Sequence, residues 1–189
     1  MKTFVKWLWR LGKHMPKRWE VRIAGLGGQG VVLAGQILGR AAVHDGKNAV
    51  QTQSYGAEAR GSAARSEVII SDGRIAFPKV RKCDVLVAMS QQALDKYIDS
   101  LKENGVLFVD TLVRQVPDTH EKLYRIPATE TAEKTLGNKL YANVVMLGAL
   151  VKATEITSVE AMRKAIAESV PKKFLEANLK AFEEGLKLL

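Results

Sequence analysis

Four glycines between residues 25 and 30 form the pattern with the clearest chemical meaning in this chain. Gly25-Leu-Gly27-Gly28-Gln-Gly30 follows a short apolar run and opens a helix-patterned stretch. This order of strand, glycine turn and helix is typical of a loop that holds the phosphates of a dinucleotide. The helix start offers free N–H groups and a favourable dipole to an anion. We therefore predict a cofactor site at these four glycines, with tight strand–helix packing as the alternative interpretation.

A second polar segment follows the next predicted strand. It contains the hydroxyls of Ser54 and Tyr55, and the carboxylate of Glu58 and the guanidinium of Arg60 follow between Gly56 and Gly61. Ligands of open α/β sheets bind outside the carboxyl ends of the strands, and arginine can grip a carboxylate or phosphate with two hydrogen bonds. We predict that these four side chains contribute to binding. The alternative is a structural loop with a Glu–Arg pair of little energetic weight.

A dehydrogenase interpretation lacks one expected feature. Nicotinamide-binding units carry an acidic residue about 20 residues beyond the glycines, where it binds the ribose hydroxyls. The second predicted strand, residues 48–53, has no Asp or Glu at its tip. This absence argues against a stand-alone NAD-binding oxidoreductase, which we keep as an alternative.

Residues that could supply metal or nucleophilic chemistry are scarce. The single cysteine, Cys83, cannot hold an iron–sulfur cluster, and the three histidines are scattered, so we predict no metal site and no catalytic residue. Cys83 is interpreted as an inert thiol and His44 as a surface or capping residue. Asp110 follows a buried strand and is interpreted as a site residue or a turn former. Asn143 is interpreted as a helix cap or an interface donor.

Positive charge is concentrated at the start of the chain. The formal net charge is +9, and residues 1–19 hold six basic residues, no acid and all three tryptophans. Beyond Glu20 the charges are nearly balanced, which does not predict nucleic-acid binding. No apolar run is long enough to span a bilayer. We divide the chain into an extension, residues 1–19, and a domain, residues 20–189, with a membrane-associated adaptor as a further alternative.

The remaining pattern predicts how these residues are positioned. Strands alternate with helices up to about residue 126, and the last third is helical, which indicates an α/β, Rossmann-like, mostly parallel sheet with an inserted β-hairpin. The expected strands are 21–24, 48–53, 65–71, 74–77, 84–89, 106–109 and 122–126; the expected helices are 31–43, 91–103, 129–136, 143–153, 158–168 and 171–186.

Five segments in one order resemble a known family. They are Gly25–Gly35, Gln53–Gly61, Ser66–Ser71, Ile126–Glu130 and Asn143–Leu150. Together they resemble the gamma subunit of 2-oxoacid:ferredoxin oxidoreductases, of the 2-oxoglutarate type with pyruvate and ketoisovalerate relatives, over residues 20–189. The family commonly continues with glycine after Gly61, where this chain has Ser62-Ala63. The basic extension has no recognised counterpart.

The resemblance implies a subunit that is inactive without its partners. The complex would decarboxylate a 2-oxoacid on thiamine diphosphate, pass electrons through iron–sulfur clusters to ferredoxin and transfer the acyl group to coenzyme A. The implied partners are alpha and beta subunits, with a delta subunit as a further candidate, in the cytoplasm. This chain lacks a thiamine motif and cluster cysteines, so it is expected to hold no main cofactor.

Overall fold

A computed structural model describes residues 17–55, 63–117 and 122–189 of the chain. Its elements begin with β1 (Arg18–Leu26), α2 (Val31–His44), β2 (Asn48–Ser54), β3 (Ala63–Ser71), β4 (Cys83–Ala88) and α3 (Gln91–Tyr97). They continue with η1 (Ile98–Ser100), β5 (Leu101–Asp110), β6 (Leu123–Ile126), α4 (Ala128–Leu136), η2 (Lys139–Tyr141), α5 (Ala142–Thr154), α6 (Val159–Ser169) and α7 (Lys172–Leu186).

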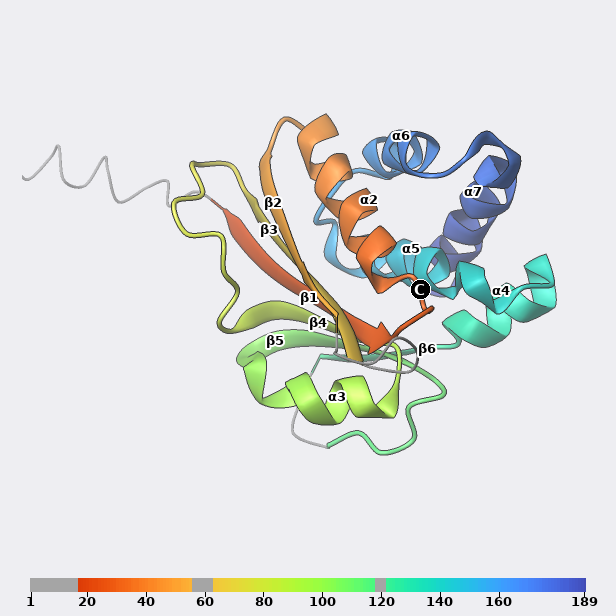
Figure 1. Cartoon of the computed structure of the whole chain (residues 1–189), viewed down its shortest axis with the longest axis horizontal. Helices are drawn as coiled ribbons and strands as arrows, with labels where there is room; N and C mark the ends of the chain where they lie inside the picture. Colours follow the sequence, from red (N-terminus) through yellow and green to blue (C-terminus); the bar gives the residue numbers. More distant parts are fainter. Residues whose placement is uncertain (1–16, 56–62, 118–121) are drawn as a thin grey trace, which may run out of the picture.

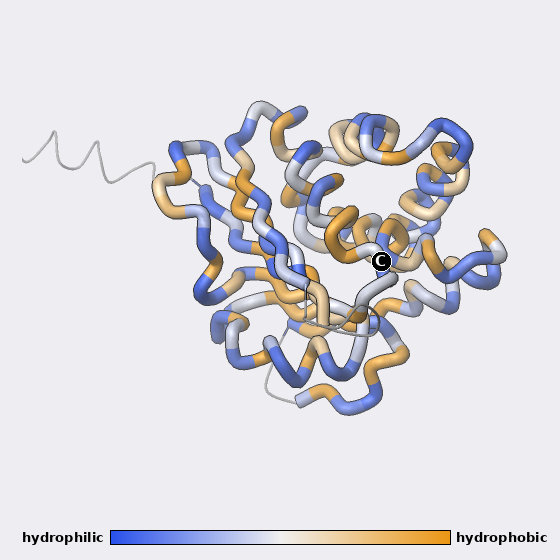
Figure 2. The backbone as a smooth tube through the Cα atoms, in the orientation of Figure 1, coloured by the Kyte–Doolittle hydropathy of each residue, from blue (hydrophilic) through white to orange (hydrophobic). Residues whose placement is uncertain are grey.

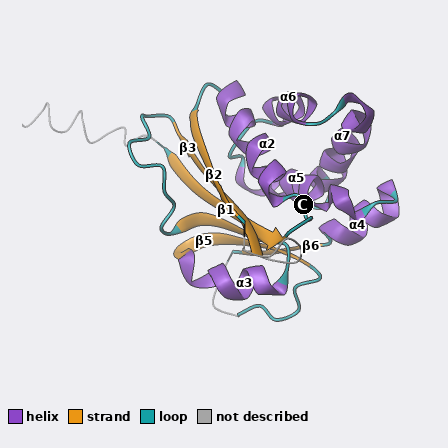
Figure 3. Cartoon of the chain, in the orientation of Figure 1, coloured by secondary structure: helices purple, strands orange, loops and turns teal. Residues whose placement is uncertain are grey.

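The described strands form one mixed sheet in the order β2-β3-β1-β4-β5-β6. The pairs β1–β4, β4–β5 and β5–β6 are parallel, whereas β3 is antiparallel to both of its neighbours, β1 and β2. Helix α3 lies on one side of the sheet, and α2 and the C-terminal helices lie on the other (Figures 1 and 3). The expected α/β class, mostly parallel sheet and helical last third are confirmed.

The sheet separates two apolar cores. Successive side chains of a strand point to opposite faces of the sheet, so alternate residues enter different cores. In β4, Val85 and Val87 face the core shared with α2 and the C-terminal helices, whereas Leu86 and Ala88 face the core under α3. Helix α5 is buried from Ala142 to Val151, and this part of the helix is therefore apolar on nearly every side. Figure 2 shows hydrophobic residues gathered along this helix and the central strands.

A buried ion pair marks the register of the antiparallel strands. Arg22 of β1 lies directly opposite Glu67 of β3, and its Nε and Nη2 donate to Oε1 of Glu67 over 2.9 and 2.6 Å. Both side chains are nearly inaccessible to solvent. Because a one-residue slip would leave both charges buried and unpaired, this pair favours the observed register.

The inserted strand is not where the alternation placed it. Arg74–Phe77 is not a strand, so the predicted hairpin of residues 65–71 with 74–77 is wrong. Instead β3 pairs with β2 and enters the sheet between β2 and β1. Consequently β2 runs in the direction of β1 but is not its neighbour, in contrast to a simple βαβ unit. Four alternating residues before Pro78 are too few to decide a pairing that depends on distant partners.

The helix predicted over residues 91–103 is too long. Helix α3 ends at Tyr97, and β5 begins at Leu101, so Asn104-Gly105 lies inside a strand and does not terminate a helix. Leu101 is buried and pairs with Cys83, and the ladder shifts register before Val85. A Cβ on Gly105 would lie 2.8 Å from the carbonyl oxygen of Lys102, so glycine permits this bend.

Other predicted boundaries are confirmed by their capping contacts. Ser90 accepts a hydrogen bond from the N–H of Ala93 at the start of α3, and Ser158 accepts one from Ala161 at the start of α6. Gly137 ends α4 in the left-handed conformation, with φ of 68°. These are local signals, and the sequence shows them directly.

Two glycines allow the backbones of α5 and α7 to approach closely where the helices cross. A Cβ on Gly185 would lie 2.9 Å from Cα of Gly148, and one on Gly148 would lie 2.8 Å from Cα of Gly185. The backbones therefore touch without side chains between them.

The start of β1 leads to a prediction about truncation. The strand begins at Arg18, and Trp19 is partly buried against the main core opposite Ile70. Removing residues 1–16 should leave the thermal midpoint unchanged. Removing residues 1–19 should preserve the fold but lower stability by about 1–3 kcal/mol, because Trp19 leaves the sheet. Thermal unfolding followed by circular dichroism compares the two, and equal midpoints would show that Trp19 contributes nothing.

Candidate functional site

The glycine loop lies at the carboxyl end of β1 and is tied to the neighbouring strand. The N–H of Gln29 donates to the carbonyl of Leu26 over 3.1 Å and closes the turn. The Gln29 side chain accepts from the Leu26 N–H over 2.7 Å and donates to the Met89 carbonyl over 2.9 Å. Gln29 therefore holds the loop in place against β4, a role that the sequence did not reveal.

The start of α2 is fixed by an asparagine from the C-terminal half of the chain. Asn143 is buried, and its Nδ2 donates to the carbonyl of Gly30 over 3.0 Å. Gly30 has φ of 70°, and a Cβ there would lie 2.5 Å from that Nδ2. Only glycine suits both the backbone angle and the approach of Asn143. Of the two roles considered for Asn143, the structure does not show the helix cap, because α5 is capped at Tyr141; the residue is a donor to the start of α2 within the same chain.

A cavity of about 370 Å³ opens beside this loop. It lies where the carboxyl ends of β1, β4 and β5 meet the beginnings of α4 and α5, the usual ligand position in such sheets. Its lining comprises Leu26, Gly27, Gly28, Gln29, Met89, Leu112, Thr129, Lys139, Leu140 and Ala142. Apolar groups dominate the lining, and the exposed Lys139 is its one charged side chain.

The electrostatics of this cavity favour an anion at one end. No side chain caps the start of α2, and its first turn contains no acidic residue. The helix dipole and the nearby Lys139 therefore act on the same region. Leu112 and Leu140, which are 60% and 61% exposed, form apolar edges around the opening. The cavity suits a ligand with an anionic group and an apolar arm.

Asp110 is buried behind the wall of this cavity and does not line it. It is fully buried, and its carboxylate accepts from the N–H of Leu112 over 3.0 Å. It also accepts from the N–H and hydroxyl of Thr129 over 2.9 and 2.8 Å. Of the two roles the sequence left open, the structure shows the turn former, because both carboxylate oxygens are occupied by the loop and the helix start.

The predicted site residues divide into three groups. Gly27 and Gly28 line the cavity, while Gly25 and Gly30 permit the close packing behind it. Ser54 and the 63% exposed Tyr55 lie at the end of β2, two strands away from β1, and do not line this cavity. Glu58 and Arg60 lie outside the described residues. Lys139 is a site residue that the sequence did not single out.

Cys83 lies at the amino end of β4, away from the glycine cavity. Its thiol is buried and donates to the carbonyl of Ser100 over 3.5 Å. Burial raises the pKa of the Cys83 thiol to about 11, so the reactive thiolate is scarce at neutral pH. His44 ends α2 and contacts Glu168 over 3.1 Å. Within the described ranges, no group of three metal-ligating side chains is found.

This burial gives a prediction about thiol reactivity. In the folded protein at pH 8, Cys83 should react with a thiol reagent at least about tenfold more slowly than after unfolding, because the raised pKa and burial both protect it. Time courses in buffer and in denaturant measure the ratio. Equal rates would show an accessible thiolate instead.

The same pKa shift predicts that the free energy of unfolding falls as pH rises from about 9 toward about 11, because the Cys83 thiol ionises first in the unfolded chain.

Comparison with known proteins gives matches along most of the chain. Residues 20–188 match the family described as pyruvate ferredoxin/flavodoxin oxidoreductase. The 2-oxoglutarate synthase subunit KorC of Methanocaldococcus jannaschii is 52% identical over 177 residues, which cover 92% of this chain and 95% of the relative.

No helix in the described part of the chain is long and apolar enough to cross a membrane.

The fold also resembles solved structures of related proteins. The gamma subunit of a keto/oxoacid ferredoxin oxidoreductase from Geobacter sulfurreducens has a TM-score of 0.82 at 46% identity, covering 91% of this chain and 96% of that one. A 2-oxoglutarate:ferredoxin oxidoreductase from Magnetococcus marinus, with 2-oxoglutarate, coenzyme A and succinyl-CoA bound, has a TM-score of 0.81 at 23% identity. The match covers 91% of this chain and 31% of that chain, and it supports the fold alone.

Proposed function

The chain belongs to the pyruvate ferredoxin/flavodoxin oxidoreductase family, and on that premise we propose that it is the gamma subunit of a 2-oxoglutarate:ferredoxin oxidoreductase. The complex cleaves the bond between the carboxylate and the keto carbon of 2-oxoglutarate, releases carbon dioxide and forms succinyl-CoA. The electrons reduce ferredoxin. The observation that carries the proposal is the 52% identity to the KorC subunit over nearly the whole of both chains.

The fold supports a subunit that shapes a site and leaves the redox chemistry to its partners. The single cysteine is buried and protonated, so it does not fit an iron–sulfur cluster, which needs several accessible thiolates. We therefore assign the clusters and thiamine diphosphate to the alpha and beta subunits, with a delta subunit as a further partner. The complex is proposed to work in the cytoplasm, without a nucleic-acid partner.

The sheet order supports this function over a stand-alone NAD-binding enzyme. In dinucleotide-binding domains the acidic residue for the ribose stands at the end of the strand beside the glycine loop. Here β3 separates β2 from β1, and the end of β2 carries Gln53 and Ser54 with no carboxylate. Neither the side chain nor the position for ribose binding is present there.

The chain's contribution is proposed to be part of the coenzyme A site. A cavity of about 370 Å³ holds one arm of such a long cofactor but not all of it. Lys139 and the N–H groups of the glycine loop would bind a phosphate, and the apolar edges would contact the arm. Ser54 and Tyr55 at the end of β2, together with Glu58 and Arg60, which follow them in the sequence, are proposed to contact the acyl acceptor or the 2-oxoacid at a subunit interface.

The role of Lys139 is testable in the assembled complex. Lys139→Gln should raise the KM for coenzyme A about three- to tenfold, because a charge-assisted hydrogen bond to a phosphate is lost. The KM for 2-oxoglutarate and kcat should change little. Lys152→Gln, at an exposed position in the last turn of α5, is the matched control. Unchanged constants for coenzyme A in the Lys139 variant would remove this residue from the site.

The substrate assignment has its own experiment. The complex is purified through a tag on this chain, and ferredoxin reduction is measured with 2-oxoglutarate, pyruvate and 2-oxoisovalerate, each with coenzyme A. The highest kcat/KM is expected with 2-oxoglutarate. A higher value with either of the other acids would overturn the substrate, although not the family.

A further inference from the structure

A second feature lies at the opposite end of the sheet from the glycine cavity. There the connection from β3 to β4, residues 72–82, passes the beginning of β1 (Figure 1). A shallow hollow of about 450 Å³ at this end is lined by Arg18, Glu20, Phe77, Lys79, Arg81, Lys82 and Lys102. We call these residues the basic face. Its single carboxylate stands among five basic side chains.

The charges of the basic face are only partly neutralised. Glu20 pairs with Arg18 over 2.7 Å, and Asp84 pairs with Lys102 over 2.7 Å. Lys79, Arg81 and Lys82 have no carboxylate within ion-pair distance among the described residues. The proximity of Asp84 and Glu20 keeps the pKa of Lys102 above its usual value despite partial burial. The face therefore carries an uncompensated positive charge toward solvent at neutral pH.

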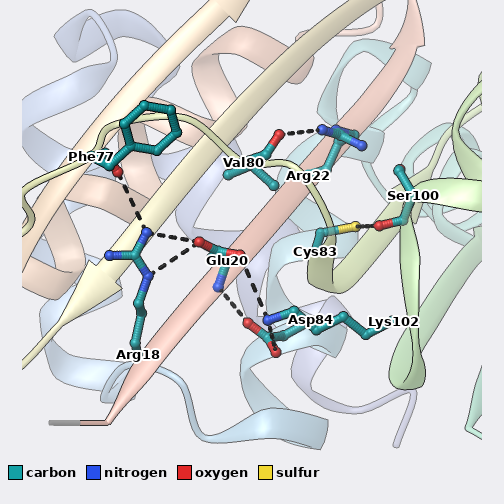
Figure 4. A network of polar contacts seen from close by, with 9 residues as sticks. All are labelled: Arg18, Glu20, Arg22, Phe77, Val80, Cys83, Asp84, Ser100 and Lys102. Atoms are coloured by element: carbon teal, nitrogen blue, oxygen red, sulfur yellow. Dashed lines mark hydrogen bonds and ion pairs between the residues drawn. The ribbon is translucent and has the colours of Figure 1, made fainter.

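The connection that carries these cations is held in place by its carbonyl groups. Arg22 donates to the carbonyl of Val80 over 2.9 Å, and Val80 itself is buried. Arg18 contacts the carbonyl of Phe77 over 3.5 Å, and Asn48 contacts that of Gly73 over 3.3 Å. Figure 4 shows the first two of these contacts beside the Glu20–Lys102–Asp84 network. The segment is irregular in form but fixed along its length.

The fixed segment presents an aromatic side chain among the cations. Phe77 is 50% exposed, and the Arg81 guanidinium lies 5.5 Å from the centre of its ring. Aromatic residues and arginine are enriched at the centres of protein interfaces, and a preorganised segment loses little entropy on binding. A large exposed aromatic group, carried by this segment beside cations that have no carboxylate partner among the described residues, is therefore suited to a protein surface of opposite charge.

We propose that the basic face is a docking surface for an acidic surface on a partner subunit of the same complex. This inference rests on the proposed function, which supplies the partner subunits. The hollow is shallow, and its cations lie at the surface, which suits a protein partner better than an enclosed small anion. The face also lies away from the glycine cavity, so it serves assembly and not the binding of coenzyme A.

The test uses the complex purified through a tag on this chain. Dissociation on dilution is followed by mass photometry at low and moderate salt. The double variant Arg81→Glu/Lys82→Glu should raise the apparent Kd for this chain at least about tenfold and flatten its dependence on salt. Phe77→Ala should weaken association without changing the salt dependence. Lys172→Glu/Lys173→Glu, an exposed pair at the start of α7, should change neither.

The outcomes separate this proposal from the proposed function. If the wild-type chain recovers no partner subunits, the proposed function fails. If the complex forms and the Arg81/Lys82 variant dissociates like wild type, the docking surface is wrong. An intact variant complex with a raised KM for ferredoxin would assign the face to the electron carrier, and one with lost binding to phosphatidylserine vesicles would assign it to a membrane. Both results would overturn the proposal.

Discussion

Gly185→Val is expected to be the most destabilising single substitution considered for this chain. The valine side chain would enter the backbone of α5 at Gly148, where even a Cβ lies 2.9 Å from the facing Cα. Because backbone atoms cannot move aside as a flexible side chain can, α5 and α7 must separate. Overpacking typically costs about 1–3 kcal/mol, and we expect a loss of about 3 kcal/mol or more here, because the facing atoms belong to the backbone of α5.

Chemical denaturation of the full chain measures this loss. Lys180→Val, at an exposed position of the same helix, controls for the lower helix propensity of valine and should cost about 0.5 kcal/mol. Similar midpoints for Gly185→Val and Lys180→Val would show that the helices do not cross at these glycines. A partial effect with Gly185→Ala is expected because one methyl group already makes the contact too short.

Gly30→Val should have the largest effect on the candidate site. The residue has φ of 70° and faces Asn143 Nδ2. A β-branched side chain is strained at this angle by about 1–3 kcal/mol, and it also displaces the Asn143 hydrogen bond. The start of α2 would move, so the assembled complex should lose most of its activity with coenzyme A.

Gly46→Val is the control that distinguishes the effect of backbone strain from the effect of a changed site geometry. Gly46 has φ of 73° but no atom within 4 Å of an added Cβ, and it lies beyond the other end of α2. Gly46→Val should lower the free energy of unfolding through the same backbone strain as Gly30→Val, while kcat and both KM values of the complex stay near wild type. If Gly30→Val behaves in the same way, the glycine loop takes no part in the reaction.

The sequence predicted the features that depend on neighbouring residues. The β1 strand, glycine turn and α2 helix follow from a short pattern, and Ser90, Gly137 and Ser158 mark helix boundaries by contacts within a few residues. These signals act locally, so they can be read without knowledge of the sheet order.

The remaining features depend on partners far away in the chain. Insertion of β3 beside β1 is stabilised by contacts such as Arg22–Glu67, which join residues 45 positions apart. In the sequence, Arg22 and Glu67 look like residues on the solvent-exposed face of a strand, because charged residues usually lie there. In the structure both side chains are buried. Gln29 and Lys139 gave no local sign of their roles, because these depend on the end of β4 and on the cavity that the folded chain creates.

The central claim is that this chain is a subunit of an enzyme that oxidises 2-oxoglutarate. The most direct measurement is ferredoxin reduction by material purified through a tag on the full chain, with 2-oxoglutarate and coenzyme A supplied together and separately. Reduction should require both substrates and should be accompanied by succinyl-CoA. The account would be contradicted if other subunits were recovered with the chain but the activity remained in the unbound fraction.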